Sequence, residues 1–442
     1  MYTCGPTVWN YAHIGNFRTF VFEDILRRHL EFKGYRIVQV MNITDVEDKI
    51  IKGIKEFHKS LKELTDFYTA AFMEDLAALN VERAEHFPRA TAHIQEMLEL
   101  IHTLQRKGYA YRAPDGSVYF DVSKFKRYGA LSGVKLNSLK PAGRVSSDHY
   151  EEKKEAADFA LWKAWDHDDG EVFWETDLGK GRPGWSIECS AMSMKYLGET
   201  FDIHTGGMDN KFPHHENEIA QSEAATGKNF VNYWLHSEFL NVHGEEMHKS
   251  AGNFVTFREL LQQGWDPLAI RLFLISARYR DQIDLTDAAL EQARSQRARM
   301  QELIARLRSV KGKDAKGEAL AKTFLADFES AMDDDLNTPK AISVLLTFTK
   351  RVNALIDSES IGESGASRIL DALERANSVL GVMEFGQQTL EPELEELIKK
   401  REEARERRDF GESDRLRQEL LAAGIAVEDT ADGTRWKRAT RG

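Results

Sequence analysis

The sequence predicts an α/β fold, with a doubly wound parallel-sheet domain that carries an inserted helical region, followed by an all-α helical bundle and a small C-terminal domain. Three observations predict this order. A strand–helix–strand pattern fills residues 1–50, strands and helices alternate again over 171–250, and helical periodicity runs from about Asp266 to Leu380. Strands that alternate with helices indicate a parallel sheet, and the long helical stretch indicates a separate helical layer.

The first unit of the sheet is predicted from residues 1–50. Tyr2–Val8 is a short apolar and β-branched run, and Arg36–Thr44 is a second one. Between them, apolar side chains recur at three- and four-residue steps over Asn16–Phe32, and Gly34 stands where a helix ends. Two strands joined by a helix lie parallel, so the domain is expected to be Rossmann-like.

The insertion is expected over about residues 60–170. Residues 61–110 have helical spacing, whereas 111–170 are mixed and contain a strand-like run at Ser117–Val122. Beyond the insertion, Phe201–His204 is predicted as a strand, followed by a glycine-rich turn and a helix from Pro213. Val231–Val242 is a further strand-rich stretch.

Three domains follow from these patterns, with boundaries at 1–265, 266–385 and 386–442. The segment Gln387–Pro392 has the composition of a linker. Glu393–Ala422 is predicted as a charged helix pair, and Ile425–Lys437 as a small hairpin.

Composition excludes several classes of protein. Hydrophobic residues make up 42% of the chain and charged residues 30%, which is typical of a globular protein and not of a disordered one. The net charge of −12 disfavours a polycationic nucleic-acid binder, although a local basic patch stays open. No apolar run has the length of a membrane span and the N-terminus does not have the pattern of a signal peptide, so a cytoplasmic protein is expected.

The segment His13–Asn16 (HIGN) lies between the first predicted strand and helix. A helix N-terminus presents free backbone N–H groups that suit phosphate, and Gly15 permits close approach of a nucleotide to the backbone. A loop with a capping Asn16 is the alternative interpretation, and only the position in a strand–helix unit favours the nucleotide.

The segment 212–218 (FPHHENE) places His214 and Glu218 four residues apart, on one helix face. With the chain's two cysteines, Cys4 and Cys189, they would supply the donors of a zinc site. Two cysteines so far apart in sequence do not indicate a disulfide framework. Helix geometry does not decide between His214 and His215, and a buried or surface pair without metal is the alternative.

The segment 246–250 (EMHKS) precedes Gly252. A lysine such as Lys249 in a glycine-containing loop is suited to hold triphosphate charge, whereas the alternative is an ordinary surface turn.

Taken in order, these motifs resemble those of class I aminoacyl-tRNA synthetases, and among them the cysteinyl-tRNA synthetases. The resemblance covers nearly the whole chain. It rests on 4–20 (CGPTVWNYAHIGNFRTF), 42–49 (NITDVEDK), 181–192 (GRPGWSIECSAM), 201–222 (FDIHTGGMDNKFPHHENEIAQS), 245–254 (EEMHKSAGNF), 333–339 (DDDLNTP) and the tail 401–436.

The resemblance implies an ATP-dependent ligase that activates L-cysteine and transfers it to tRNA(Cys), with one Zn²⁺ per chain and ATP–Mg²⁺ as substrate. The implied zinc ligands are Cys4, Cys189, His214 and Glu218. Zinc binds a thiolate far better than a serine hydroxyl, which explains how cysteine would be selected without an editing domain.

The remaining implied residues bind ATP and cysteine. HIGN stands for the family's HIGH signature and 246–250 for KMSKS, with Lys249 as its second lysine. His13, Asn16 and Lys249 are the expected catalytic residues. Gly15, Gly206, Gly207, Asp209 and Lys249 are expected at the nucleotide, and Thr44 and Trp185 in the cysteine pocket.

The chain departs from the family pattern in three places. It has three residues before Cys4, where the family usually has about a strand and a loop more. Glu246 and His248 replace a lysine and a small residue, and Ser186 and Thr205 replace the more usual His and Gly.

Two other functions stay open at this point. A related ligase could join activated cysteine to an amino sugar, but such ligases lack a full anticodon-binding region, whereas residues 290–442 here form a helical and basic-ended segment expected to bind tRNA. A catalytically silent RNA-binding paralogue would have no need of the four candidate zinc ligands. We expect a monomer.

Overall fold

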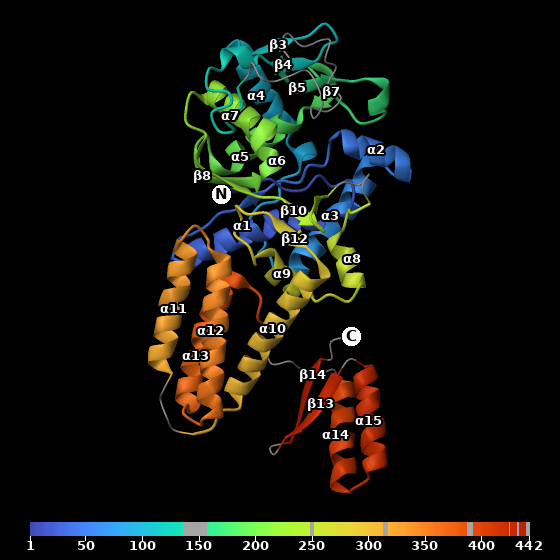
Figure 1. The fold of residues 1–442 in the computed structure, drawn as a ribbon. Coiled ribbons are helices and arrows are strands. Elements are labelled where there is room, and N and C mark those ends of the chain that lie inside the picture. The colour runs from blue at the N-terminus through green and yellow to red at the C-terminus, as the bar shows by residue number, and fades with distance from the viewer. Residues whose placement is uncertain are drawn as a thin grey trace. The chain divides into compact units, whose positions relative to one another are not determined.

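The computed structural model of the chain describes residues 1–135, 157–247, 252–312, 317–386, 392–423, 425–430 and 433–438. The chain forms two compact units, Met1–Met383 and Glu384–Gly442. Figure 1 labels the helices and strands of both.

A parallel sheet lies at the centre of the first unit. Its strands are β1 (Tyr2–Thr3), β2 (Val40–Met41), β8 (Phe201–Gly207) and β9 (Val231–Ser237), in the order β2-β1-β8-β9. Tyr2 pairs with Val40 on one side and with His204 on the other. All three pairings are parallel, which confirms the predicted doubly wound sheet.

Helix α1 (Ile14–Phe32) connects β1 to β2. It begins two residues before the predicted start, because the side chains of His13 and Asn16 cap its first turn. Gly34 follows with φ +89°, which confirms the predicted helix end. The two strands are shorter than predicted: beyond Thr3 and Met41 the pairing of the two segments continues only as the isolated bridge between Thr7 and Thr44.

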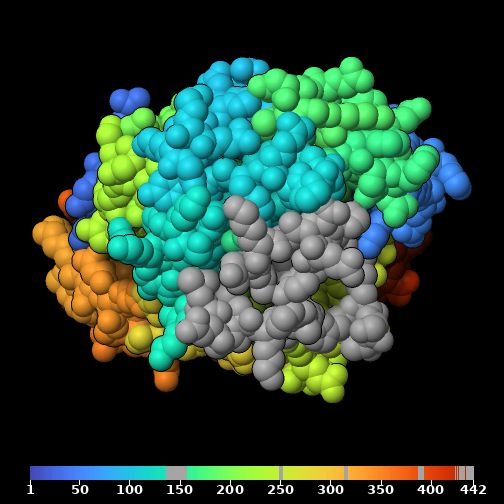
Figure 2. Space-filling view, turned by 90° about the horizontal axis from the view of Figure 1, so that it is seen from above, coloured from blue at the N-terminus to red at the C-terminus, as the bar shows by residue number. Residues whose placement is uncertain are grey.

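The inserted region combines helices with a second sheet, of which the sequence predicted one strand. Its helices are α2 (Asp48–Phe57), α3 (Leu61–Ala78) and α4 (Ile94–Arg106), with short turns at Ala90–Ala92, Val122–Lys124 and His167–Asp169. Its antiparallel strands are β3 (Ala110–Arg112), β4 (Val118–Phe120), β5 (Phe159–Ala164), β6 (Trp174–Thr176) and β7 (Gly179–Pro183), in the order β3-β4-β5-β7-β6. Figure 2 shows the described part of this region, in cyan and green, on one face.

The chain returns to the parallel sheet through α5 (Trp185–Leu197), which leads into β8. The predicted glycine-rich turn is wrong in its first part, because β8 continues through Gly206 and Gly207 as the hydrogen-bonding partner of β9. The short helix α6 (Met208–Asn210) and the turn Lys211–His215 then lead into α7 (Glu216–Thr226).

A small three-stranded sheet follows β9. It contains β10 (Leu240–Val242), β11 (Glu245–Glu246) and β12 (Ile283–Leu285), with helices α8 (Phe257–Gln262) and α9 (Pro267–Leu274) between β11 and β12. The prediction of uninterrupted helix over 266–380 is therefore wrong at Ile283–Leu285. That run is too short to stand out among helices, and it is a strand because it pairs with β10.

Four helices form the bundle of the first unit: α10 (Asp287–Arg308), α11 (Glu318–Asp333), α12 (Thr338–Asp357) and α13 (Glu363–Leu380). Their core includes a stack of Phe324 on Phe348, with ring centroids 4.1 Å apart. Arg28 of α1 donates to the Ser378 carbonyl of α13, and the fully buried Arg271 of α9 donates to the Leu380 carbonyl. The bundle is thus joined to the parallel-sheet domain by buried arginines.

The second unit contains α14 (Pro392–Glu406), α15 (Phe410–Ala422), β13 (Ile425–Thr430) and β14 (Gly433–Arg438). The strands pair antiparallel, which confirms the predicted helix pair and hairpin. Ile398, Leu420, Ile425 and Val427 form its apolar core. Among all the described helices, none has the length and apolar character needed to cross a membrane.

Candidate metal and nucleotide-binding site

Four side chains from distant parts of the sequence meet at the end of the parallel sheet. Cys4 follows β1, Cys189 lies on α5, His214 precedes α7 and Glu218 lies on it. All four are buried, and one donor atom from each lies within 4.8 Å of the others. The two cysteines are free thiols.

A second set of donors shares two of these residues. Cys4, His204, His215 and Glu218 also come within 4.8 Å of one another. Both additional histidines already have partners at both ring nitrogens. His215 contacts His236 at 2.8 Å and the Cys4 sulfur at 3.3 Å, while His204 contacts Glu218 Oε2 at 3.0 Å and the Thr205 carbonyl at 3.2 Å.

Two donor atoms have no hydrogen bond: one belongs to His214, which is found only in the first set, and the other to Glu218, which both sets share. His214 Nε2 and Glu218 Oε1 are buried and make no hydrogen bond, although they lie 3.2 Å apart. Buried polar atoms without partners are rare in folded proteins. The other nitrogen of His214 lies 3.1 Å from Ser186 Oγ, the kind of outer contact that orients a metal-binding imidazole. Two sulfurs, one nitrogen and one oxygen fit the donor preference of Zn²⁺.

The electrostatics of the cluster favour a cation. Burial would raise the pKa of Cys189, but the hydrogen bond from Cys4 and the nearby His214 outweigh it and hold that pKa well below its usual value. Burial, the hydrogen bond with Cys189 and its negative charge raise the pKa of Cys4. The pKa of Glu218 is raised by burial and by the Cys189 charge. When Cys4, Cys189 and Glu218 are all deprotonated, their negative charges repel one another, and a bound divalent cation would offset this repulsion.

Trp185 and Thr44 lie next to the cluster. The Trp185 ring stacks on His214 with centroids 4.0 Å apart, and it is 41% exposed. Buried Thr44 donates to Glu188 Oε2 at 3.2 Å. Trp185 therefore offers an accessible aromatic surface above a buried donor set. Thr44 lies close to Glu188, which is on α5 together with Trp185.

The HIGN segment forms the N-terminus of α1. The Asn16 N–H donates to His13 Nδ1 at 3.2 Å, and the His13 N–H donates to Asn16 Oδ1 at 3.1 Å. A side chain at Gly15 would come within 2.8 Å of the terminal methyl group of Met247 and 3.0 Å of His13 Nδ1, so a larger residue would require the flexible end of Met247 to move. The Ile14 N–H also donates to the Val255 carbonyl at 2.9 Å.

The glycines of β8 lie at the same end of the sheet. A side chain at Gly206 would come within 2.9 Å of the His215 ring. The Gly207 N–H donates to Asn210 Oδ1 at 3.2 Å. Burial raises the pKa of Asp209. The structure thus places Gly206, Gly207 and Asp209 beside the buried histidines, at the carboxyl end where parallel sheets bind ligands.

The expected lysine of the site, Lys249, lies outside the described residues, as does His248. Glu246 lies in β11 opposite Asn241, and its carbonyl accepts a hydrogen bond from Asn253 Nδ2 at 3.0 Å. The segments on both sides of 248–251 therefore contact each other.

Several site residues were missed by sequence reasoning. Glu188 is buried, and burial raises its pKa well above the usual range. His204 and His236 are buried as well, and burial lowers the pKa of each to about 3, so both are neutral imidazoles. The two histidines lie in strand-like runs of the sequence, and this was the signal that could have identified them as site residues. A histidine in a strand, however, is most often an ordinary core residue.

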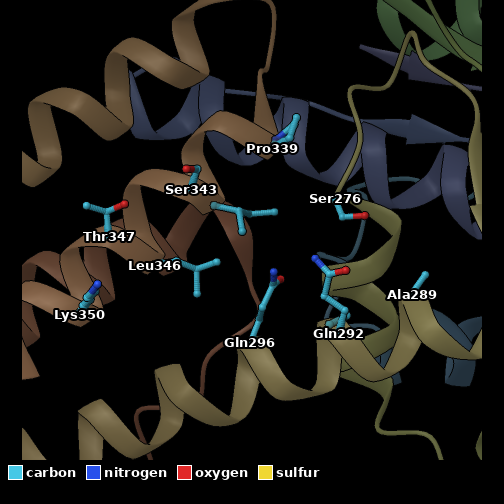
Figure 3. A pocket seen from close by; sticks show the side chains of 11 residues that line it. Ser276, Ala289, Gln292, Gln296, Pro339, Ser343, Leu346, Thr347 and Lys350 are labelled. Atoms are coloured by element: carbon cyan, nitrogen blue, oxygen red, sulfur yellow. The ribbon is translucent and has the colours of Figure 1, made fainter.

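A separate pocket of about 530 Å³ lies between α10 and α12 of the bundle (Figure 3). Its polar lining includes Gln292, Gln296, Ser343, Thr347 and Lys350. These groups donate and accept hydrogen bonds but form no acid–base pair, so the pocket does not share the chemistry of the cluster.

Comparison with known proteins yields one family. Residues 1–295 match the family described as "tRNA synthetases class I (C) catalytic domain", residues 327–384 the DALR domain, and residues 387–436 the "Cysteinyl-tRNA ligase anticodon binding domain". A cysteine–tRNA ligase of Brachyspira hyodysenteriae is 47% identical over 99% of this chain and 94% of its own length. One of Chlamydia pneumoniae is 46% identical over 99% and 93%.

Solved structures show the same fold at low identity. A Mycobacterium tuberculosis methionyl-tRNA synthetase with methionyl-adenylate aligns with TM-score 0.61 at 14% identity, over 86% of this chain and 89% of that one. A LeuRS–tRNA complex of Agrobacterium radiobacter aligns with TM-score 0.59 at 10% identity, over 88% and 85%.

Proposed function

The chain belongs to the cysteinyl-tRNA synthetase family, and from this premise we propose that it forms cysteinyl-adenylate from L-cysteine and ATP and transfers the cysteinyl group to tRNA(Cys). One observation carries the proposal: two thiols, an imidazole and a carboxylate converge beside an accessible tryptophan, with two of their donor atoms unpaired. A metal ion held by these donors would allow a catalytic domain to select the thiol of cysteine over the hydroxyl of serine.

We propose that Cys4, Cys189, His214 and Glu218 hold one Zn²⁺. When bound, zinc supplies a soft acceptor that prefers a substrate thiolate to a serine hydroxyl. An apolar pocket alone discriminates such similar groups poorly. Ser186 orients His214 through its second nitrogen, and Trp185 covers the His214 ring, so the protein fixes the direction in which the substrate side chain enters.

ATP is proposed to bind at the neighbouring edge. The N-terminus of α1, with Gly15, offers backbone N–H groups and a positive dipole end to the phosphates. His13 and Asn16 hold this turn in shape through their reciprocal hydrogen bonds. Gly206, Gly207 and Asp209 are proposed to contact the adenosine, and Lys249 would neutralise the leaving pyrophosphate, with Mg²⁺ as its partner ion.

No protein nucleophile is required by this reaction. The cysteine carboxylate attacks the α-phosphate, pyrophosphate leaves, and the terminal ribose hydroxyl of the tRNA then takes the cysteinyl group. Catalysis rests on the positions of the reactants and on stabilisation of charge. The chain's contribution is the rigid edge of the sheet on which both substrates are held.

We propose that tRNA(Cys) binds along the helical bundle and the C-terminal unit. The match of residues 387–436 to an anticodon-binding domain supports this and weighs against the amino-sugar ligase. A monomer in the cytoplasm is proposed as well, in keeping with a role in protein synthesis.

The test combines three assays on the full chain. Cysteine-dependent exchange of pyrophosphate into ATP measures adenylate formation, charging of tRNA(Cys) measures transfer, and elemental analysis measures zinc. We expect all three to be positive, with serine inactive in exchange. Exchange without tRNA charging would favour the amino-sugar ligase, and RNA binding without exchange would favour a silent paralogue.

A further inference from the structure

A patch of aromatic side chains lies beside the N-terminus of α1 and takes no part in the site described above. This aromatic rim consists of Tyr11, Phe57, Phe67 and Tyr68. Tyr11 precedes His13 by two residues, Phe57 ends α2, and the other two lie on α3. Phe57 is 38% exposed and Phe67 46%, so two phenyl rings of the rim face solvent.

The rings form one continuous surface. Tyr68 contacts Tyr11 at 5.3 Å, Phe67 at 5.1 Å and Phe57 at 6.5 Å between centroids. All of these contacts are edge-on or tilted, and none is a parallel stack. The exposed rings therefore do not cover each other face to face. Lys59 Nζ lies over one face of Phe67, and a flat base can stack on a ring face that is left open.

Cations flank both ends of the rim. Lys59 Nζ lies 4.7 Å from the centre of the Phe67 ring, and the Arg258 guanidinium lies 5.0 Å from the centre of Tyr11. Arg258 is held in place by Asp75 at 2.9 Å and by the Ala71 carbonyl. A surface that alternates aromatic rings with cations suits an unpaired nucleotide strand, because the bases stack while the cations meet the phosphates.

Apart from Glu56, whose charge acts on Tyr68, the following neighbouring carboxylates are bound by other groups. Asp66 pairs with Lys62 and Arg89, Glu63 accepts from Ser60, and Glu74 pairs with Arg258. Repulsion of a phosphate strand by these acids is therefore reduced.

The rim lies at the reactive edge of the sheet. Helix α2 starts four residues after Thr44, beyond the carboxyl end of β2. Helix α1 starts at Ile14, at the end of the loop that leads from Cys4 through Ala12. Figure 1 shows α2, α3 and α8 along one side of this unit. In the proposed reaction the terminal ribose of the tRNA must reach the adenylate, so the unpaired nucleotides before it must bind near this end of the sheet.

We propose that the aromatic rim binds the unpaired 3′ end of the tRNA, with its bases stacked on Phe57 and Phe67 and its phosphates near Lys59. This inference rests on the proposed function, since it gives the tRNA substrate a place in that site. The rim is a binding surface and does not touch the reacting atoms.

The test uses leucine substitutions, which keep apolar volume but remove the ring face. Phe57→Leu and Phe67→Leu are compared with Tyr35→Leu, an exposed aromatic control that is 65% exposed beyond the far end of α1. Each full-length variant is first checked by thermal melting. Two RNAs are used as probes: a tRNA(Cys) transcript, and the same transcript without its unpaired 3′ nucleotides.

We expect each rim variant to weaken binding of the complete transcript by about fivefold or more, the loss that stacking of one base accounts for. Binding of the shortened transcript and cysteine-dependent pyrophosphate exchange should stay unchanged, as should every property of Tyr35→Leu. Equal losses for both RNAs, or no loss for either, would overturn the proposal.

Two further outcomes distinguish failure of the rim proposal from failure of the proposed function. A raised KM for ATP in the exchange assay, with RNA binding intact, would assign the rim to the adenine ring and overturn the proposal. Absence of exchange in the unmodified protein would refute the proposed function instead, while the comparison of the two RNAs would still decide whether the rim binds a single strand.

Discussion

Cys189 is the residue of the cluster whose charge matters most. Its pKa is held well below the usual range, since the hydrogen bond from Cys4 and the nearby His214 outweigh burial, and this favours the thiolate form that binds a metal. Serine has a much poorer donor atom for zinc. We predict that Cys189→Ser raises KM for cysteine by more than about 100-fold, beyond the range that outer contacts of a metal site account for.

The KM for ATP should change little in that variant, as measured by pyrophosphate exchange. Ser193→Ala is a matched control, because Ser193 is buried on the same helix and donates only to the Ser190 carbonyl. Equal losses of cysteine and ATP affinity in Cys189→Ser would contradict the assigned role.

Thr205, which replaces the family's usual glycine, has a structural explanation. Its hydroxyl donates to Glu23 Oε1 at 2.8 Å, and burial raises the pKa of Glu23 to about 8. A carboxyl whose folded pKa lies above its unfolded value of 4.5 favours folding most below pH 4.5, and this advantage is lost as pH rises to about 8.

We therefore predict that Glu23→Gln stabilises the protein at pH 8 relative to the unmodified chain, by up to about 4 kcal/mol, with little gain at pH 4.5. Urea unfolding at both pH values measures the difference. A gain that is the same at both pH values would mean that Glu23 does not titrate as described.

At the scale of elements, we propose that the segment from β11 to Lys249 contributes to how pyrophosphate is held. Glu246 stands where the family usually has a lysine, and a carboxylate about 4 Å from a phosphate oxygen costs roughly 1–4 kcal/mol near a surface. We predict that Lys249→Ala slows adenylate formation by about 100-fold or more. Glu246→Lys should leave the rate equal or raise it, as measured by single-turnover kinetics with saturating ATP.

We propose that Lys249 carries the essential contact and that Glu246 faces solvent or Mg²⁺. Loss of activity in Glu246→Lys, with the fold intact by circular dichroism, would show that the carboxylate has a positive role. Asn253→Ala serves as a control for the loop, because it removes the hydrogen bond to the Glu246 carbonyl without a change of charge.

The elements differ in how far the sequence predicts them. Helix α1 was predictable because its apolar spacing and its end at Gly34 are local signals. Strands β1 and β2 are only two residues long. They pair with each other, and the second partner of β1, β8, lies about 200 residues away, so no local pattern sets their ends. The inserted sheet was largely missed because Val118 pairs with Trp162, across the region 136–156.

The site residues also divide into those that the sequence predicts and those that only the folded structure identifies. Cys4, Cys189, His214 and Glu218 were predicted from motifs, and the structure brings their donor atoms together. The buried partners could not be predicted, because Glu188, His204 and His236 act only through contacts made by folding. A single sequence does not distinguish such residues from ordinary core histidines and acids.

At the scale of the whole molecule, the place where the chain can be cut follows from its buried contacts. A cut near residue 290 would remove α13 and leave Arg271 and Arg28 without the carbonyls of Leu380 and Ser378. Both arginines would keep Asp24 as a partner, but the loss of acceptors for buried N–H groups is costly, so that fragment should be less stable. A cut after Met383 keeps these contacts and removes only the second compact unit.

We predict that the chain ending at Met383 retains cysteine-dependent exchange but binds tRNA(Cys) at least about tenfold more weakly, a loss of about 1.4 kcal/mol. Exchange kinetics and filter binding measure the two effects, after thermal melting has shown that the fragment folds. Unchanged tRNA affinity in this fragment would show that the second unit does not contribute to recognition.

The most direct test of the central claim is X-ray absorption at the zinc edge of the purified full chain, with and without cysteine. The cluster supplies two sulfur ligands, one nitrogen and one oxygen. We predict one zinc per chain, two sulfur ligands in the free protein and a third when cysteine is added, with no change when serine is added. Absence of zinc, or a sulfur count that cysteine leaves unchanged, would contradict the account.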